Sequence, residues 1–225
     1  MSRWGNAEHQ PLVERIIARL ADGTELQPGK ATWLALRWYP IMLLLYAGGI
    51  AALSAGNYAM LLTLFATRLR GSSTGKQSQA AVVATVDSIL EVDRLGLFKS
   101  LPGFEKLYVP RSEYLFKTLQ PDLEDLLFLG NGYEGLFDRF EIFYALSYLD
   151  LQDEKSYVWA PPGRFGWKHH LHDHNSPYNE VIKEANQQQS AWGPTSSGMF
   201  SGSLDRFNNR ATAFAENILN KLQWW

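Results

Sequence analysis

The sequence contains no cysteine among its 225 residues. Without thiols, the chain has no disulfide framework, thiolate zinc site or cysteine nucleophile. A strong charge of either sign is also missing, because 21 Lys and Arg residues face 23 Asp and Glu residues, for a formal net charge of −2. No overall field attracts polyanions, so we expect no nucleic-acid partner. A reducing, cytoplasmic location is the expected setting.

The N-terminal stretch lacks the continuous apolar segment of a secretory signal, because Arg3, Glu8, Glu14 and Arg15 interrupt it. Residues of hydrophobic type make up 46% of the chain, which is enough for a substantial core. No linker-like change in composition divides the chain. We therefore predict a single helical domain over residues 1–225.

The longest charge-free run, residues 38–67, lies between Arg37 and Arg68. Gly56 and Asn57 form a turn pair inside this run, so we predict two antiparallel helices, over residues 32–55 and 58–69. Such a hairpin is stable only out of water. We expect it to be buried at the centre of the protein. The alternative is a membrane-associated protein that inserts the 38–67 hairpin into lipid.

Apolar residues at steps of three and four predict further helices near residues 11–20, 79–94, 133–149, 177–185 and 203–222. Pro121 and the acidic residues after it predict a helix start within 120–129. In the 133–149 helix, Glu134, Asp138 and Glu141 are expected on the polar face. Residues 156–168 are compatible with a small β-ribbon. The predicted fold class is therefore mainly α.

Two long stretches, 154–175 and 187–203, lack a strong helical pattern. Both are rich in aromatic residues. Trp and Arg side chains dominate the energetics of protein interfaces, so we predict a protein-binding surface here. Its candidate residues are Trp159, Arg164, Phe165, Trp167, Lys168, Trp192 and Phe200. The alternative is that these rings pin the two stretches to the core.

Four of the five histidines fall in the segment KHHLHDHN. Imidazole and carboxylate groups are metal ligands, which gives a second alternative, a metal-dependent enzyme. Its candidate ligands are His169, His170, His172, Asp173 and His174. Their spacing does not match a known metal motif, and no complete catalytic set occurs in the sequence. We therefore expect no cofactor, no metal and no catalysis.

The segment ALSAGNYAMLLTLFA, residues 52–66, resembles the turn of one tetratricopeptide-type hairpin, without a second copy at a period of about 34 residues. The segments RWYPIMLLLYAGGIAALSAGNY, FYALSYLDL and WAPPGRF together resemble an uncharacterised helical region at the C-terminal side of bacterial multidomain, defence-related proteins. Because no complete catalytic set occurs, we expect a non-catalytic interaction or sensor module, and the resemblance implies that it works beside an effector subunit. It implies no particular site residues.

Overall fold

A computed structural model describes residues 1–22, 31–69, 78–152, 158–171 and 176–222. The fold is mainly α, as predicted. The α-helices are α1 (Gln10–Asp22), α2 (Ala31–Leu36), α3 (Tyr39–Leu53), α4 (Tyr58–Ala66), α5 (Ala81–Arg94), α6 (Pro110–Leu127), α7 (Tyr133–Leu151), α8 (Phe165–Leu171), α9 (Pro177–Gln188), α10 (Gly193–Ser196) and α11 (Leu204–Asn217). Short 3₁₀ turns are η1 (Ala7–His9), η2 (Phe98–Ser100), η3 (Gly130–Gly132), η5 (Gln189–Ala191), η6 (Met199–Gly202) and η7 (Leu219–Lys221).

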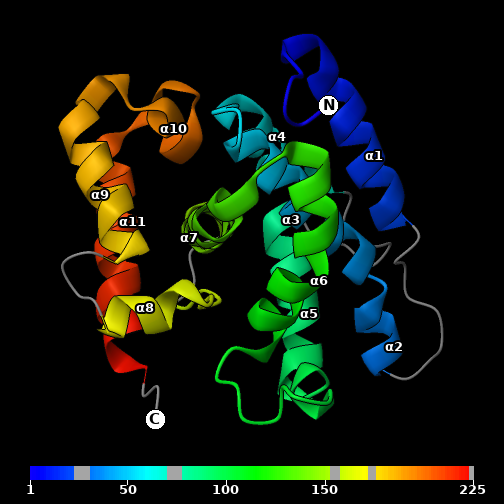
Figure 1. Cartoon of the computed structure of the whole chain (residues 1–225). Coiled ribbons are helices and arrows are strands. Elements are labelled where there is room, and N and C mark those ends of the chain that lie inside the picture. Colours follow the sequence, from blue (N-terminus) through cyan, green and yellow to red (C-terminus); the bar gives the residue numbers. More distant parts are fainter. Residues whose placement is uncertain (23–30, 70–77, 153–157, 172–175, 223–225) are drawn as a thin grey trace.

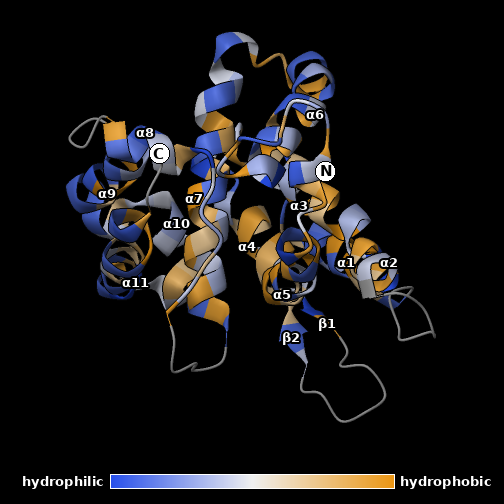
Figure 2. Cartoon of the chain, turned by 90° about the horizontal axis from the view of Figure 1, so that it is seen from below, coloured by the Kyte–Doolittle hydropathy of each residue, from blue (hydrophilic) through white to orange (hydrophobic). Residues whose placement is uncertain are grey.

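Helix α7 joins the two sides of the molecule (Figure 1). On one side it contacts α3, α4, α5 and α6, and on the other it contacts α8, α9 and α11. Helices α1 and α2 lie at the edge farthest from α9 and α11 in both views (Figures 1 and 2). Buried apolar residues from Val13 to Leu219 form one cluster that crosses α7.

The predicted central hairpin is present, but its first helix is shorter than predicted. The prediction of one helix over residues 32–55 was wrong, because the chain forms α2, turns at Arg37 and Trp38, and then forms α3. Pro40 stands in the first turn of α3, where its missing N–H costs nothing, whereas inside a longer helix it would clash with the preceding turn. The turn between α3 and α4 is as predicted, with Gly56 at a φ of 64° and Asn57 capping α4 through the Met60 N–H.

The span Thr32–Leu53 is long and apolar enough to cross a membrane by length and composition, and 44% of its apolar window is buried inside the structure. Core helices of soluble proteins meet the same criterion. Helix α3 contacts α4, α5, α6 and α7, and Ile41, Leu45 and Ile50 have no exposed surface. The buried face of α3 is therefore packed against other helices of the chain.

The predicted helix start at Pro121 was wrong. Helix α6 begins eleven positions earlier with Pro110 in its first turn, and Pro121 lies inside it. The apolar residues before Gln120 do not follow a regular helical spacing, so the sequence did not indicate the longer helix. The first turn of α6 and the segment 158–164 line the same cavity.

Helix α7 is buried almost all round, since every residue from Phe140 to Asp150 is buried. Asp138 and Glu141 were expected on a polar face, and this was wrong: their exposed fractions are 1% and 3%. Glu134, one turn earlier, stays half exposed. The interior of the protein therefore holds two carboxyl groups whose partners come from other elements.

The predicted ribbon at 156–168 was also wrong, because residues 158–164 are irregular and α8 follows. The two described strands, β1 (Arg68–Leu69) and β2 (Gln79–Ala80), pair antiparallel with Arg68 opposite Ala80. Two helix starts are confirmed: the Ser176 hydroxyl accepts from the Asn179 N–H, and the Ser203 hydroxyl accepts from the Arg206 N–H.

Candidate functional site

Most of the seven residues predicted to bind a protein partner lie inside the molecule. Phe165 and Trp192 have no exposed surface, Phe200 is 3% exposed and Arg164 is 7% exposed. Trp159, Trp167 and Lys168 are partly buried. The structure therefore does not bring the seven together as one surface.

The aromatic members of that set hold the C-terminal helices together. The Phe165 ring stacks on Tyr178 of α9 with centroids 6.2 Å apart. The Trp192 ring lies 4.5 Å from Phe207 of α11, and its indole N–H donates to Glu184 Oε1 at 2.9 Å. Such packing stabilises the core, which is the alternative role that the sequence left open for these rings.

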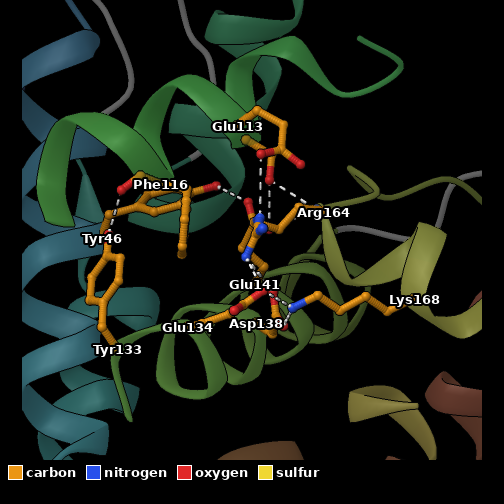
Figure 3. Close-up of polar contacts among 10 residues, drawn as sticks. Tyr46, Glu113, Phe116, Tyr133, Glu134, Asp138, Glu141, Arg164 and Lys168 are labelled. Atoms are coloured by element: carbon orange, nitrogen blue, oxygen red, sulfur yellow. Dashed lines mark hydrogen bonds and ion pairs between the residues drawn. The ribbon is translucent and has the colours of Figure 1, made fainter. Parts of the chain in front are cut away.

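Arg164 and Lys168 belong to a buried ionic cluster between α6, α7 and α8 (Figure 3). The Arg164 guanidinium lies 3.0 Å from Glu134, 3.5 Å from Glu113 and 3.6 Å from Asp138. It also covers the Phe116 ring at 3.7 Å. Lys168 pairs with Glu134 at 2.5 Å and with Asp138. Burial raises the pKa of Asp138 in spite of these two cations.

Glu141, on the same helix as Asp138, is also enclosed. Its Oε1 accepts from the Tyr46 hydroxyl at 3.1 Å, and its Oε2 accepts from the Ser112 hydroxyl at 2.7 Å and from the Arg164 backbone N–H at 3.0 Å. Burial raises the pKa of its carboxyl group from 4.5 to about 7, although the Ser112 hydrogen bond acts in the opposite direction. The Glu141 proton therefore titrates near neutral pH.

Glu141 and Arg164 fix the position of residues 158–164, which we call the strap. A side chain at Gly163 would place its Cβ 2.2 Å from Glu141 Oε2, so only glycine permits this close approach. The Arg164 N–H is held by both Glu141 and Ser112. The end of the strap is thus tied to α6 and α7 by backbone contacts as well as by charge.

A cavity of about 300 Å³ lies between the strap, the start of α6 and the end of α5. Its walls combine aromatic rings, prolines and charged groups from three separate parts of the chain. The lining residues are Asp93, Phe98, Lys99, Tyr108, Val109, Pro110, Arg111, Ser112, Trp159, Pro161 and Pro162. Convergent charged groups in an apolar concave site are typical of small-ligand binding.

Arg111 is the buried cation of this cavity, with 8% of its surface exposed. One Nη donates to Asp93 at 2.7 Å, whereas its buried Nε–H has no acceptor among the described residues. Burial acts to lower the pKa of Arg111, but Asp93 and the nearby tyrosines raise it overall, so the guanidinium stays charged. Lys99, at the exposed side, forms no ion pair with another described residue.

Ser112 links the cavity to the ionic cluster, because it lines the first and hydrogen-bonds Glu141 in the second. A serine beside a carboxylate suggests a nucleophile and its base. Here the Ser112 hydroxyl is 2% exposed, donates to Glu141 and accepts from the Arg164 N–H. Both hydrogen-bonding functions are thus used in positioning the strap, and the arrangement favours binding over catalysis.

The histidine cluster is only partly described. His169 and His170 lie in α8, where a ring nitrogen of His169 is 2.9 Å from the Ser176 hydroxyl, while His172, Asp173 and His174 lie outside the described residues. Among the described residues, no group of three or more His, Asp or Glu side chains has a geometry that would hold a metal ion.

Sequence reasoning missed Arg111, Ser112 and Glu141. Pro110 was the available signal, since proline favours a first helical position and would have placed Arg111 and Ser112 in the first turn of a helix. The partners of Glu141 come from residues 29 and 95 positions away, which no local pattern indicates. No protein-family model, curated protein or solved structure matches the chain.

Proposed function

We propose that this chain is a non-catalytic helical sensor module that takes a small ligand into the cavity at the start of α6. The cavity of about 300 Å³ carries this proposal, because its volume is at the lower end of the range for ligand sites. The charged residue Arg111 is nine-tenths buried in its wall. A single-ring compound is the size of ligand that fits.

The strap supplies the means by which a bound ligand would be sensed. Trp159, Pro161 and Pro162 contact the cavity, and two residues later Arg164 joins α6 and α7. Helix α8 begins immediately after Arg164. A ligand that shifts the strap therefore changes the contacts of α8 on the opposite side of α7. Such a signal requires that the ligand bind one position of the strap more tightly than another.

The same proposal includes a protein partner, an effector subunit of a bacterial defence-type system, as the sequence resemblance implies. The proposed location is cytoplasmic, as expected from the lack of cysteine. Exposed apolar side chains on α1 and α2 support a partner surface. Leu12, Ile16 and Leu20 follow one face of α1 and are 38 to 42% exposed, and Trp33 of α2 is 67% exposed. Apolar side chains gathered on one helix face are typical of interaction sites.

A cavity-filling variant tests the ligand site. Val109 lines the cavity, so Val109→Trp should occupy part of its volume. We expect single-ring compounds found by a thermal-shift screen on the wild-type chain to bind this variant at least about tenfold more weakly, a loss of about 1.4 kcal/mol. Isothermal titration calorimetry measures the change.

The matched control is Leu126→Trp, which adds the same ring to the other end of α6 at a side chain that is 71% exposed. It should leave the affinities unchanged. Compounds that bind Val109→Trp as tightly as the wild-type chain would contradict the proposed site. A screen in which no compound stabilises the wild-type chain would contradict the sensor function itself.

A further inference from the structure

We infer that the ligand of this cavity is a small flat anion, a single ring that carries a phosphate monoester or a carboxylate group. This inference rests on the proposed function and adds the chemical class of the ligand. It is carried by the distribution of charge and of aromatic surface around the cavity.

The formal charge of the lining side chains is positive overall. Two cations, Lys99 and Arg111, face one carboxylate, Asp93. Asp93 is already paired with one Nη of Arg111 at 2.7 Å, which leaves the charge of Lys99 without a partner among the described residues. The lining therefore has an excess of one positive charge at neutral pH, carried by Lys99 at the exposed side of the cavity.

Arg111 also supplies hydrogen-bond donors to the lining. Arg111 lines the cavity, and its guanidinium donates one hydrogen bond among the described residues, to Asp93 at 2.7 Å. Arg111 also has the planar group that matches the oxygen spacing of phosphate and carboxylate.

The first turn of α6 also favours an anionic ligand. This helix is 18 residues long, and Val109 caps it without a side-chain hydrogen bond. Arg111 and Ser112, in the first turn, line the cavity, and no described group accepts from their backbone N–H groups. The positive end of the helix dipole adds to the attraction for an anion.

The remaining walls fit a flat apolar group. Trp159, Tyr108 and Phe98 supply three rings, and Pro110, Pro161 and Pro162 supply rigid apolar surface. Tyr108 is 49% exposed and Phe98 is 4% exposed, so the aromatic part of the lining includes both an exposed and a buried ring. Stacking on such surfaces favours planar ligands over flexible chains.

Calorimetry with four probes tests this class: phenyl phosphate, benzoate, uncharged benzyl alcohol and inorganic phosphate. We expect phenyl phosphate to bind tightest, benzoate next, and the two partial probes at least about tenfold more weakly. Raising the ionic strength should weaken phenyl phosphate but not benzyl alcohol, because salt screens only the charged contact. Inorganic phosphate that binds as tightly as phenyl phosphate would contradict the part assigned to the ring.

Lys99→Ala tests the charge without disturbing the core, because this side chain is exposed. It should weaken phenyl phosphate by about fivefold, leave benzyl alcohol unchanged and keep the thermal midpoint. Lys99→Arg should restore binding. Lys183→Ala, at an exposed site of α9 away from the cavity, is the matched control and should change nothing.

The outcomes separate the two proposals. If benzyl alcohol binds as tightly as phenyl phosphate, or if Lys99→Ala has no effect on phenyl phosphate, the anionic class is wrong while the sensor site stands. If none of the four probes binds although single-ring compounds from the screen bind in a Val109-dependent manner, the class is again wrong. If the screen also finds no compound, the proposed function fails as well.

Discussion

Replacing Gly49 by alanine is expected to destabilise the protein by about 3 kcal/mol, although alanine favours helices over glycine by about 1 kcal/mol. A Cβ at this position would lie 2.2 Å from the Phe140 ring of α7. That ring has no exposed surface and is enclosed by Tyr46 and Tyr144, 4.6 and 5.6 Å away, so it has no free space to move into. The thermal midpoint should fall by about 6 to 12 °C.

Gly48→Ala is the matched control for this prediction. At the neighbouring position the nearest atoms to a new Cβ are Leu64 Cδ1 and Ser2 Oγ, both at 3.2 Å, and both belong to side chains that can yield slightly. Its thermal midpoint should stay within a few degrees of the wild-type value. If the two variants behave alike, α3 does not pack on α7, and the interpretation of α3 as a lipid-inserted helix gains support.

Replacing Glu141 by glutamine is expected to change how stability depends on pH. The folded-state pKa of Glu141 is raised from 4.5 to about 7, so the folded protein holds this proton more tightly than the unfolded chain. Its contribution to stability is fully present below pH 4.5 and is lost as the pH rises through 7. Glutamine keeps the shape and acceptor oxygen but does not titrate. The free energy of unfolding of Glu141→Gln minus that of the wild-type chain should therefore rise by about 3 kcal/mol between pH 4 and pH 8.

Denaturant unfolding at each pH measures this difference. Subtraction of the wild-type curve removes the effects of other shifted groups, such as Asp138, whose pKa is also raised, and Glu134, whose pKa Lys168 lowers. Glu216→Gln, at an exposed carboxylate of α11, should give a flat difference. A flat or falling difference for Glu141→Gln would show that Glu141 is not enclosed as described.

Local signals were sufficient for much of the helical fold. Gly56 and Asn57 marked the turn of the central hairpin, and Ser176 and Ser203 marked helix starts, because each of these depends on hydrogen bonds within three residues. The period of Phe137, Phe140 and Tyr144 likewise marked a buried helix face. These features follow from backbone chemistry and from helix geometry alone.

The errors arose where distant residues decide. Asp138 and Glu141 were predicted on the polar face because carboxylates are rarely buried. Their burial is made tolerable by partners from other elements, which are Lys168, Arg164, Ser112 and Tyr46. Pro121 was predicted to start a helix because a proline in a helix interior usually destabilises the helix by about 3 kcal/mol. Helix α6 continues through it.

The candidate site was predictable only in part. Trp159 and Arg164 were selected from composition, and both lie in the strap, yet the aromatic residues Phe165, Trp192 and Phe200 serve the core. The cavity depends on three segments that meet only in the folded chain. A sequence shows which residues have suitable chemistry, and the long-range packing decides which of them share a site.

Hydrogen–deuterium exchange with and without saturating phenyl phosphate tests most directly whether this cavity binds the ligand and acts on the strap. We expect slower exchange in the first turn of α6 and in residues 158–164, which line the cavity together, and no change in α1, which does not line it. Calorimetric binding of phenyl phosphate without slower exchange in those two segments, or with slower exchange confined to α1 and α2, would contradict the sensor site.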